Sequence, residues 1–259
     1  MPTMKIYVAT PCAHDLVVSH CSASLFYLAQ MFGRSGVEVD IRFLGLSDLE
    51  VSRSVLASHF FAEPSYTHLL FVDSDMSFEA SLVRRMIQFD EDFVSALYAR
   101  RQLNLDRLIK HARDNPEEAA HAVVSRSLDY VGLVAGEAAT QDKEKVEIQS
   151  KNGFVTAAQT GMGLCLLKRR VVEEMVARGV VTTDGRASTV SPWPVPYFSF
   201  FHKERVSECV SYSEDLSFCR RWTIGCGGTI WACVDKAIGH HGNFEFSGAY
   251  VEKLKAGEG

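Results

Sequence analysis

The sequence predicts an α/β fold in which a mostly parallel central sheet is flanked by helices. Apolar runs alternate with amphipathic patterns over about 100 residues, as expected for βαβ units. The run Leu69–Val72 is apolar without polar alternation, which is typical of a strand buried on both faces of a parallel sheet. Apolar residues make up 47% of the 259 residues, so a sizeable core is expected and global disorder is excluded.

Composition narrows the classes of protein further. The formal net charge of −5 argues against a general nucleic-acid coat, which needs a basic surface. The 7 cysteines are scattered without a CxxC pair, so we expect small buried thiols in a reducing compartment and no zinc site or disulfide framework. We find no basic-then-apolar leader and no run of about 18 apolar residues, and therefore expect a cytoplasmic protein without a transmembrane segment.

The first elements follow in order. Lys5–Ala9 is predicted to be a strand, and Thr10 and Pro11 open the loop after it. This loop lacks the glycine fingerprint of a pyrophosphate loop, so a dinucleotide fold is not expected. Apolar residues spaced i, i+3, i+4, i+7 from Leu25 predict a helix that ends near Gly33 or Gly36. Residues 37–44 alternate as a second strand.

A second helix precedes the central strand. Ser47–Glu50 has a capping-box pattern and predicts a helix that runs to about Ala62. Arg53 lies on this helix, and by itself it indicates a solvated or ion-paired arginine. After the central strand, the apolar positions of Leu82–Ile87 predict another helix, and Phe93–Tyr98 the next strand.

The central strand ends in two carboxylates, Asp73 and Asp75, with Ser74 between them. Ligands of open α/β sheets bind outside the carboxyl ends of the strands, so both carboxylates are predicted to reach the binding edge. A hard divalent cation that carries a substrate phosphate is the natural partner of such a pair. The alternative is an Asp-rich turn, because Asp and Ser favour turns and helix starts.

The second half of the chain carries fewer signals. Residues 100–151 are rich in charge and helix formers and are predicted to form an insertion in a single domain, 1–259. Basic residues gather at its start, as on a solvated helix face, although Arg100 could also contact a phosphate. Gly161 and Gly163 beside an apolar strand indicate a close approach of backbone or ligand. Trp193, in a polar loop over 182–196, is expected to be exposed and to stack on a sugar or staple the loop.

Three features lie near the C-terminus. Glu214 and Asp215 stand in the first turn of a predicted helix, where acidic residues stabilise the helix dipole. His240 and His241, between two glycines, indicate either a metal ligand or a turn. The tail from Lys253 is expected to fray.

These features together resemble the nucleotide-sugar-dependent glycosyltransferases of the GT-A fold, of bacterial or phage type. The resemblance rests on four motifs that occur in the same order, and it spans roughly residues 5–243. The motifs are Asp73–Asp75, Gly161–Gly163, Ser213–Asp215 and Gly239–Gly242.

The resemblance implies a metal site. Asp75 would ligate Mn²⁺ or Mg²⁺ directly, and Asp73 would help to hold the ion and contact the ribose. His240 would be a further ligand, since His241 is one residue out of register with the family's His-x-Gly motif.

It also implies a nucleotide site and a base. Thr10, Pro11 and Ser74 would lie at the nucleotide, and Arg53 near its diphosphate. Related sequences carry Arg-Asn where this chain has Arg53 and a serine, which weakens that assignment. Asp215, next to Glu214, would be the catalytic base.

The implied activity is transfer of a sugar from a nucleotide diphosphate donor, a UDP-sugar by preference, to an acceptor hydroxyl with inversion. The resemblance leaves four classes of acceptor open: a glycan, a lipid-linked sugar, a protein or a modified DNA base. One alternative is a haloacid-dehalogenase-type phosphatase, but its Asp-x-Asp motif normally follows the first strand. A sugar-nucleotide pyrophosphorylase would need a glycine-rich basic first loop, and a non-catalytic sugar-nucleotide module is the remaining alternative.

Overall fold

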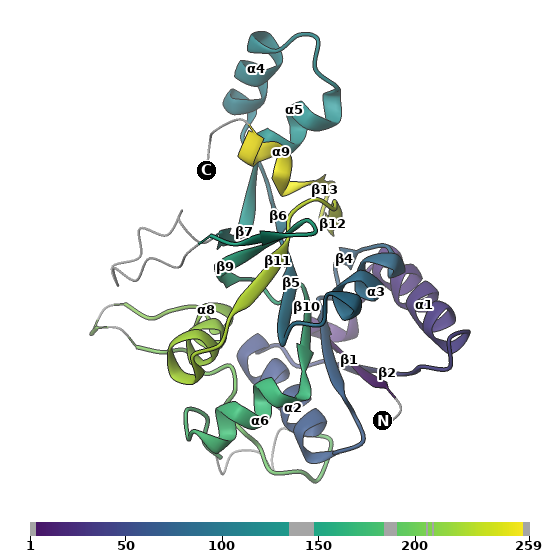
Figure 1. Cartoon of the computed structure of the whole chain (residues 1–259), viewed down its shortest axis with the longest axis vertical. Helices are drawn as coiled ribbons and strands as arrows, with labels where there is room; N and C mark the ends of the chain where they lie inside the picture. Colours follow the sequence, from purple (N-terminus) through teal and green to yellow (C-terminus); the bar gives the residue numbers. More distant parts are fainter. Residues whose placement is uncertain (1–3, 135–147, 184–190, 206, 209, 256–259) are drawn as a thin grey trace.

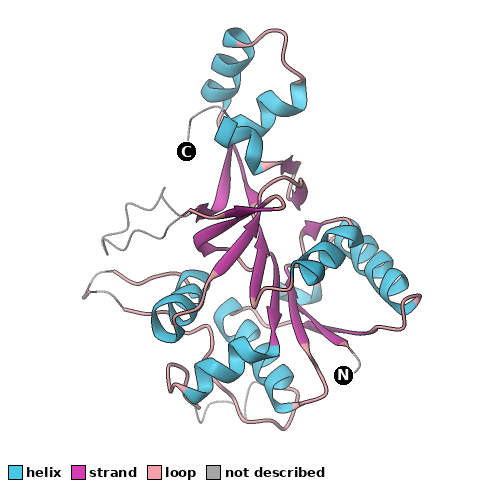
Figure 2. Cartoon of the chain, in the orientation of Figure 1, coloured by secondary structure: helices cyan, strands magenta, loops and turns pink. Residues whose placement is uncertain are grey.

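The computed structural model describes residues 4–134, 148–183, 191–205, 207–208 and 210–255. Strands and helices alternate in the N-terminal part, and helices lie on both sides of the sheet (Figures 1 and 2). The elements of this part are β1 (Lys5–Pro11), η1 (Ala13–Asp15), α1 (Ser19–Gly33), β2 (Glu38–Leu44), α2 (Leu49–Ala62), β3 (His68–Val72), β4 (Met76–Ser77), α3 (Ala80–Phe89) and β5 (Phe93–Ala96).

The remainder of the chain extends the sheet and adds two helices at one end. Helices α4 and α5 follow β6 and precede β7 in the chain, and they lie at the end of the molecule away from α1 and α3 (Figure 1). Part of the predicted insertion, 135–147, lies outside the described residues. The elements are β6 (Tyr98–Leu103), α4 (Leu105–Asp114), α5 (Ala120–Ser127), β7 (Leu128–Val134), β8 (Ser150–Lys151), β9 (Phe154–Thr160), β10 (Leu164–Lys168), α6 (Arg169–Ala177), α8 (Glu214–Arg220), η2 (Arg221–Gly225), β11 (Ile230–Cys233), β12 (Ile238–His241), β13 (Glu245–Gly248) and α9 (Tyr250–Lys255).

The large sheet has the strand order β2-β1-β3-β10-β5-β11-β9-β7-β6. β1 pairs in parallel with β2 and β3, and β11 pairs in parallel with β5. β10 runs antiparallel between β3 and β5, so these five parallel strands still point the same way. The predicted fold class, a Rossmann-related, mostly parallel sheet flanked by helices, is therefore confirmed. A small second sheet joins β13, β12 and β4.

Strand β3 lies at the centre of the core. Leu69, Leu70, Phe71 and Val72 are all 0% exposed, as the uninterrupted apolar run predicts. Leu69 and Phe71 pack in the layer that contains α2 and α6, whereas Leu70 and Val72 pack in the layer of α1 and α3. Each such side chain stabilises the fold by about 1.5–3 kcal/mol. The strand that ends in Asp73 is thereby held rigidly.

Helix α2 begins with a different cap from the one predicted. Asp48, and not Ser47, is the N-cap, and its side chain accepts a hydrogen bond of 3.2 Å from the Val51 amide. The prediction of a capping box formed by Ser47 and Glu50 is therefore wrong, because the helix begins one residue later than that pattern requires. Ser213 caps α8 by accepting from the Leu216 amide, so Glu214 and Asp215 do occupy the first turn of a helix.

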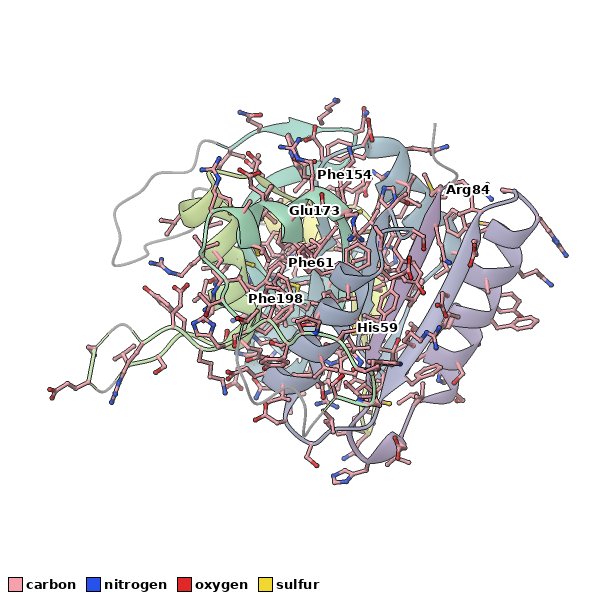
Figure 3. The ribbon with its side chains drawn as sticks, turned by 90° about the horizontal axis from the view of Figure 1, so that it is seen from below. His59, Phe61, Arg84, Phe154, Glu173 and Phe198 are labelled. Atoms are coloured by element: carbon pink, nitrogen blue, oxygen red, sulfur yellow. The ribbon has the colours of Figure 1, made fainter. Side chains whose placement is uncertain are left out.

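The loop that contains Trp193 packs on α2. Trp193 is half-buried and stacks on His59, with 4.2 Å between the ring centroids. Beside it, the Phe61 and Phe198 rings meet edge to face at 5.0 Å (Figure 3). The expectation of an exposed Trp193 is wrong, since the segment after it covers an apolar helix face; the tryptophan acts as a staple. Residues 184–190 of this loop lie outside the described residues.

Three smaller expectations concern cysteines, the tail and the membrane. The six cysteines that the structure describes are buried free thiols, as predicted, and Cys209 lies outside the described residues. Lys253 does not begin a frayed tail, because α9 continues to Lys255; residues 256–259 are not described. Within the described ranges, no helix combines the length and apolar character needed to cross a membrane.

Candidate functional site

A buried arginine joins three carboxylates from different parts of the chain. Arg53 on α2 is 1% exposed, and its Nη2 lies 2.8 and 3.0 Å from the two carboxylate oxygens of Asp73. Its Nη1 donates to Glu214 Oε1 at 3.0 Å and to Asp215 Oδ1. Arg53 is thus ion-paired, one of the two interpretations that the sequence left open. The end of β3 and the first turn of α8 meet at this side chain.

One guanidinium faces three carboxylates in this cluster, and one of them, Asp215, has a shifted pKa. Burial raises the pKa of Asp215 to about 6, against the attraction of Arg53 and with the repulsion of Glu214 and Asp73. Asp215 therefore ionises only above about pH 6. This pH is higher than its position at a helix N-terminus alone would predict. The same ion pairs, working against burial, raise the pKa of Arg53 and keep it charged.

A second cluster lies at Asp75. Its Oδ2 is 3.4 Å from His240 Nε2 and 3.0 Å from Arg101 Nη1. Burial opposes the charge on Asp75, but the contacts with His240 and Arg101 hold the pKa of this carboxyl below its usual range. Burial likewise disfavours a charged His240, yet the Asp75 carboxylate and the Ala99 carbonyl raise the pKa of the imidazole. Ala99 O lies 2.8 Å from His240 Nδ1 and orients the ring.

The two histidines have different environments. Both histidines lie on strand β12, so the alternative prediction that they form a turn is wrong. Neighbouring residues of a strand point to opposite faces. His240 contacts Asp75, whereas the His241 ring lies 2.7 Å from Ser77 Oγ and stacks on His20 at 4.3 Å. The structure therefore brings His240, and not His241, to the carboxylate.

The two glycines after β9 make room for an aromatic ring. Tyr98 is buried beneath the turn 161–163, and its hydroxyl accepts a hydrogen bond of 3.2 Å from the Gly163 amide. A Cβ atom on Gly163 would lie 2.7 Å from Tyr98 Cζ. The close approach that the glycines indicate is thus to the Tyr98 side chain. The same turn makes two further hydrogen bonds. The Met162 amide donates to Asp215 Oδ2 at 3.4 Å, and the Gly163 carbonyl accepts a hydrogen bond from the Asp73 amide.

Asp215 is also open to a cavity. A pocket of ≈ 130 Å³ lies against it, with Arg100 and Ser213 in its wall. This volume holds a few water molecules, each of about 30 Å³, or a few ligand atoms. A carboxylate that faces such a pocket can accept a proton from a ligand hydroxyl placed there.

The remaining predicted residues lie near the end of β1 and after β3. Thr10 is fully buried, and its Oγ1 has no hydrogen-bond partner among the described residues. Pro11 ends β1 and is also buried. Ser74 lies in the turn after β3, where its carbonyl accepts a hydrogen bond of 2.9 Å from the Val18 amide. Neither Thr10 nor Pro11 presents an exposed side chain to a ligand.

The donor set suits a divalent ion that is shared with a substrate phosphate. Among the described residues, no group of three Cys, His, Asp or Glu side chains is placed to hold an ion. Asp75 and His240 form a pair, and Mg²⁺-type sites often use one or two carboxylates with substrate phosphates. His240 also has the carbonyl partner on Nδ1 that metal-binding histidines usually have. Both carboxylate oxygens of Asp73 accept hydrogen bonds from Arg53.

Sequence reasoning missed Tyr98 and underestimated Arg101. Tyr98 belongs to an apolar run with no distinguishing signal. Arg101 stands in the basic cluster that was assigned to a solvated face, yet on β6 it reaches Asp75. The sequence carries no local signal for this contact, because Arg101 lies within β6 and is 26 positions away from Asp75.

Comparison with known proteins gives fold-level similarity at most. No protein-family model matches the chain, and no curated protein matches it. A structure of A197 from STIV is 13% identical with a TM-score of 0.44, covering 92% of this chain and 86% of that one. A mutant β-1,4-galactosyltransferase 7 from Drosophila, in complex with manganese, UDP-Gal and xylobiose, is 11% identical with a TM-score of 0.37. The match covers 95% of this chain and 71% of that one.

A third structure is similar at the same level. A putative glucose-1-phosphate thymidylyltransferase from Bacillus anthracis, in complex with sucrose, is 12% identical with a TM-score of 0.32, covering 67% of this chain and 74% of that one. Each of these TM-scores is below 0.5, so the similarities carry no argument about function, and the chemistry of the site is argued from its residues alone.

Proposed function

We propose that this chain is a metal-dependent glycosyltransferase that moves a sugar from a nucleotide diphosphate donor, a UDP-sugar by preference, to an acceptor hydroxyl. The observation that carries the proposal is the buried Arg53, which holds Asp73 at the end of β3 and Asp215 at the start of α8 in one cluster. The predicted donor-binding carboxylate and the predicted base are thereby held at one site. We further propose a single cytoplasmic domain over 1–259, with 100–151 as an insertion.

Asp75 and His240 are proposed to hold Mn²⁺ or Mg²⁺, with Asp73 beside them at the ribose of the nucleotide. A bound divalent ion would stabilise the negative charge that develops on the diphosphate leaving group by several kcal/mol. Arg53 positions the carboxylate of Asp73 and, through its charge, lowers the cost of gathering acidic groups here. Thr10, Pro11 and Ser74 are proposed to shape the backbone of the nucleotide site, because their side chains are mostly enclosed.

Asp215 is proposed to be the base. The acceptor oxygen attacks the anomeric carbon, its proton passes to a carboxylate oxygen of Asp215, and the bond to the diphosphate oxygen breaks. This single displacement inverts the anomeric centre. Such proton transfer typically contributes about 10²–10⁴-fold to the rate. Glu214 is proposed to share the ion pair with Arg53, since its Oε1 lies 3.0 Å from Nη1.

Thermal shift tests donor binding directly. UDP should raise the melting temperature in Mn²⁺ but not in EDTA, because a ligand of the native state stabilises it by mass action. Asp75→Asn should abolish the increase and leave the melting temperature without ligand nearly unchanged. Equal stabilisation in EDTA would contradict metal-dependent binding.

Activity assays separate this proposal from its alternatives. Release of phosphate from a simple aryl phosphate would indicate a haloacid-dehalogenase-type phosphatase, although β3 is the third strand of the chain. Nucleotide binding without turnover of any sugar donor would indicate a non-catalytic module.

A further inference from the structure

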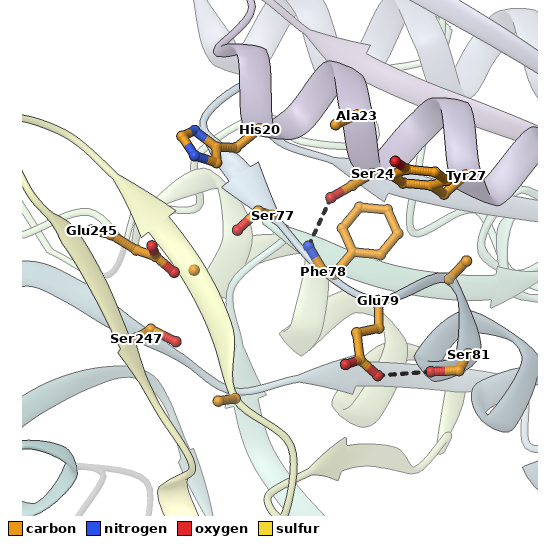
Figure 4. A pocket seen from close by; sticks show the side chains of 13 residues that line it. His20, Ala23, Ser24, Tyr27, Ser77, Phe78, Glu79, Ser81, Glu245 and Ser247 are labelled. Carbon is orange, nitrogen blue, oxygen red and sulfur yellow. Dashed lines mark hydrogen bonds between the residues drawn. The ribbon is translucent and has the colours of Figure 1, made fainter. Parts of the chain in front are cut away.

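A second, larger pocket lies between α1, β4 and β13, outside the residues of the proposed reaction. Its volume is ≈ 620 Å³. Pockets that bind small ligands usually measure about 300–1,000 Å³. Figure 4 shows side chains from α1, β4, the start of α3 and β13 around one space. None of these side chains has a role in the chemistry proposed above.

The wall of the pocket is more acidic than basic, with two carboxylates and one imidazole, that of His20, among the described lining residues. Glu79 and Glu245 supply carboxylates, and Ser77 and Ser247 supply hydroxyls (Figure 4). No Lys or Arg is among the described residues that line the pocket. A phosphate or carboxylate ligand would therefore meet two carboxylates without the Lys or Arg that forms the strongest hydrogen bonds to such groups.

Polar groups converge at Gly239, where β12 passes the pocket. A Cβ atom on Gly239 would lie 2.7 Å from Glu245 Oε1 and 3.0 Å from His241 Nε2, and it would also collide with Ser77 Oγ. The glycine therefore leaves room for these three side chains to approach one another. Of these three, Ser77 and Glu245 line the pocket, and the Glu245 carboxylate offers an acceptor to a ligand that is rich in hydroxyl donors.

Aromatic rings complete the wall. Tyr27 on α1 is 60% exposed, and Phe78 lines the pocket from the strand side. An aromatic ring beside carboxylates and hydroxyls offers an apolar surface for sugar C–H groups together with acceptors for sugar hydroxyls. We propose that this pocket binds a neutral oligosaccharide.

The pocket lies behind the small sheet that carries the proposed metal ligand His240. Ser77 pairs with Gly239 in the small sheet, and the next pair of that sheet contains His240. The His241 amide donates to the Asp75 carbonyl at 2.8 Å. The wall of the pocket and the pair of Asp75 and His240 are therefore built on the same two strands. Ser77, Gly239 and Glu245 lie on the face of the small sheet that carries His241, so the pocket and the His240 side chain are on opposite faces of that sheet.

Saturation-transfer NMR tests the pocket without relying on catalysis. The probes are maltotriose, cellotriose and chitotriose, each added to the full chain in EDTA without nucleotide. At least one of them should receive saturation from the protein. Tyr27→Ala and Glu245→Gln should each weaken its binding by about tenfold or more. Phe26→Ala is the matched control, because Phe26 is 62% exposed and adjacent on α1 but does not line the pocket.

The outcomes are distinct. Saturation of none of the probes, or an equal loss of binding in Phe26→Ala, would overturn the proposal. Binding of spermidine in place of the sugars would show a cation site and would also overturn it. Sugar binding without a Mn²⁺-dependent UDP shift would leave the pocket assigned and remove the transferase. A Mn²⁺-dependent UDP shift without sugar binding would support the transferase and overturn the assignment of the pocket.

Discussion

Arg53 Nη2 contacts both carboxylate oxygens of Asp73, at 2.8 and 3.0 Å, and this pair fastens helix α2 to the carboxyl end of β3. The pair is buried on the arginine side, where the exposed fraction is 1%. Solvent therefore screens the interaction little, and its loss leaves charge in a poorly hydrated place.

Arg53→Ala should lower the free energy of unfolding at pH 7 by about 3–5 kcal/mol, because Asp73, Glu214 and Asp215 lose their shared counter-charge. Urea denaturation measures the change. Near pH 4 the loss should be smaller, since protonated carboxyls repel one another less.

Arg178→Ala is the control for this change. Its side chain is 51% exposed and pairs with Glu174 one helical turn away, so its removal should lower the free energy of unfolding far less than the removal of Arg53 does. Similar losses for the two arginines would show that the buried cluster has no special contribution.

Asp215→Asn should lower the rate constant of transfer by about 10² or more, because the amide keeps the shape but cannot accept the acceptor's proton. The dissociation constant for UDP in Mn²⁺ should hardly change. Glu214→Gln should have a smaller effect on turnover. A rate near that of the wild type in Asp215→Asn would reduce Asp215 to a helix-start residue.

The pH profile of kcat should fall as pH drops through about 6, the pKa to which burial raises Asp215. Stability should change in the opposite direction. The folded state keeps the proton of Asp215 to a higher pH than the unfolded chain does, so this group lowers stability as pH rises from about 4 to about 6. Asp215→Asn should remove that part of the stability profile, which urea titrations at several pH values would detect.

His240→Ala should weaken the Mn²⁺ dependence of the UDP thermal shift markedly, because His240 Nε2 faces Asp75. His241→Ala should change it less, since that ring faces Ser77 and His20. Isothermal titration with Mn²⁺ in the presence of UDP measures both variants. The opposite order of effects would mean that His241 is the ligand.

Gly163→Ala should destabilise the protein by about 1–3 kcal/mol, because the added Cβ lies 2.7 Å from the Tyr98 ring in a packed turn. Gly33→Ala is the control, as nothing lies within 4 Å of the added atom at that position. Thermal denaturation of both variants compares them. Equal melting temperatures would show that the turn 161–163 can shift to admit the methyl group.

The sequence determined the central strand and its ending. An apolar run without alternation specifies a strand buried on both faces, and Leu69 to Val72 are fully buried. The placement of Asp73 and Asp75 at its carboxyl end, and of Glu214 and Asp215 at a helix start, follows from local patterns that need no distant partner.

Only the tertiary structure decided how these groups meet. Arg53 and Asp215 are 162 positions apart, and no local sequence pattern records that the guanidinium of one pairs with the carboxylate of the other. The choice between His240 and His241, and the contact of Arg101 with Asp75, depend on how β4, β6 and β12 pack. Burial then sets the pKa of Asp215, because desolvation is a property of the surrounding fold and not of the residue itself.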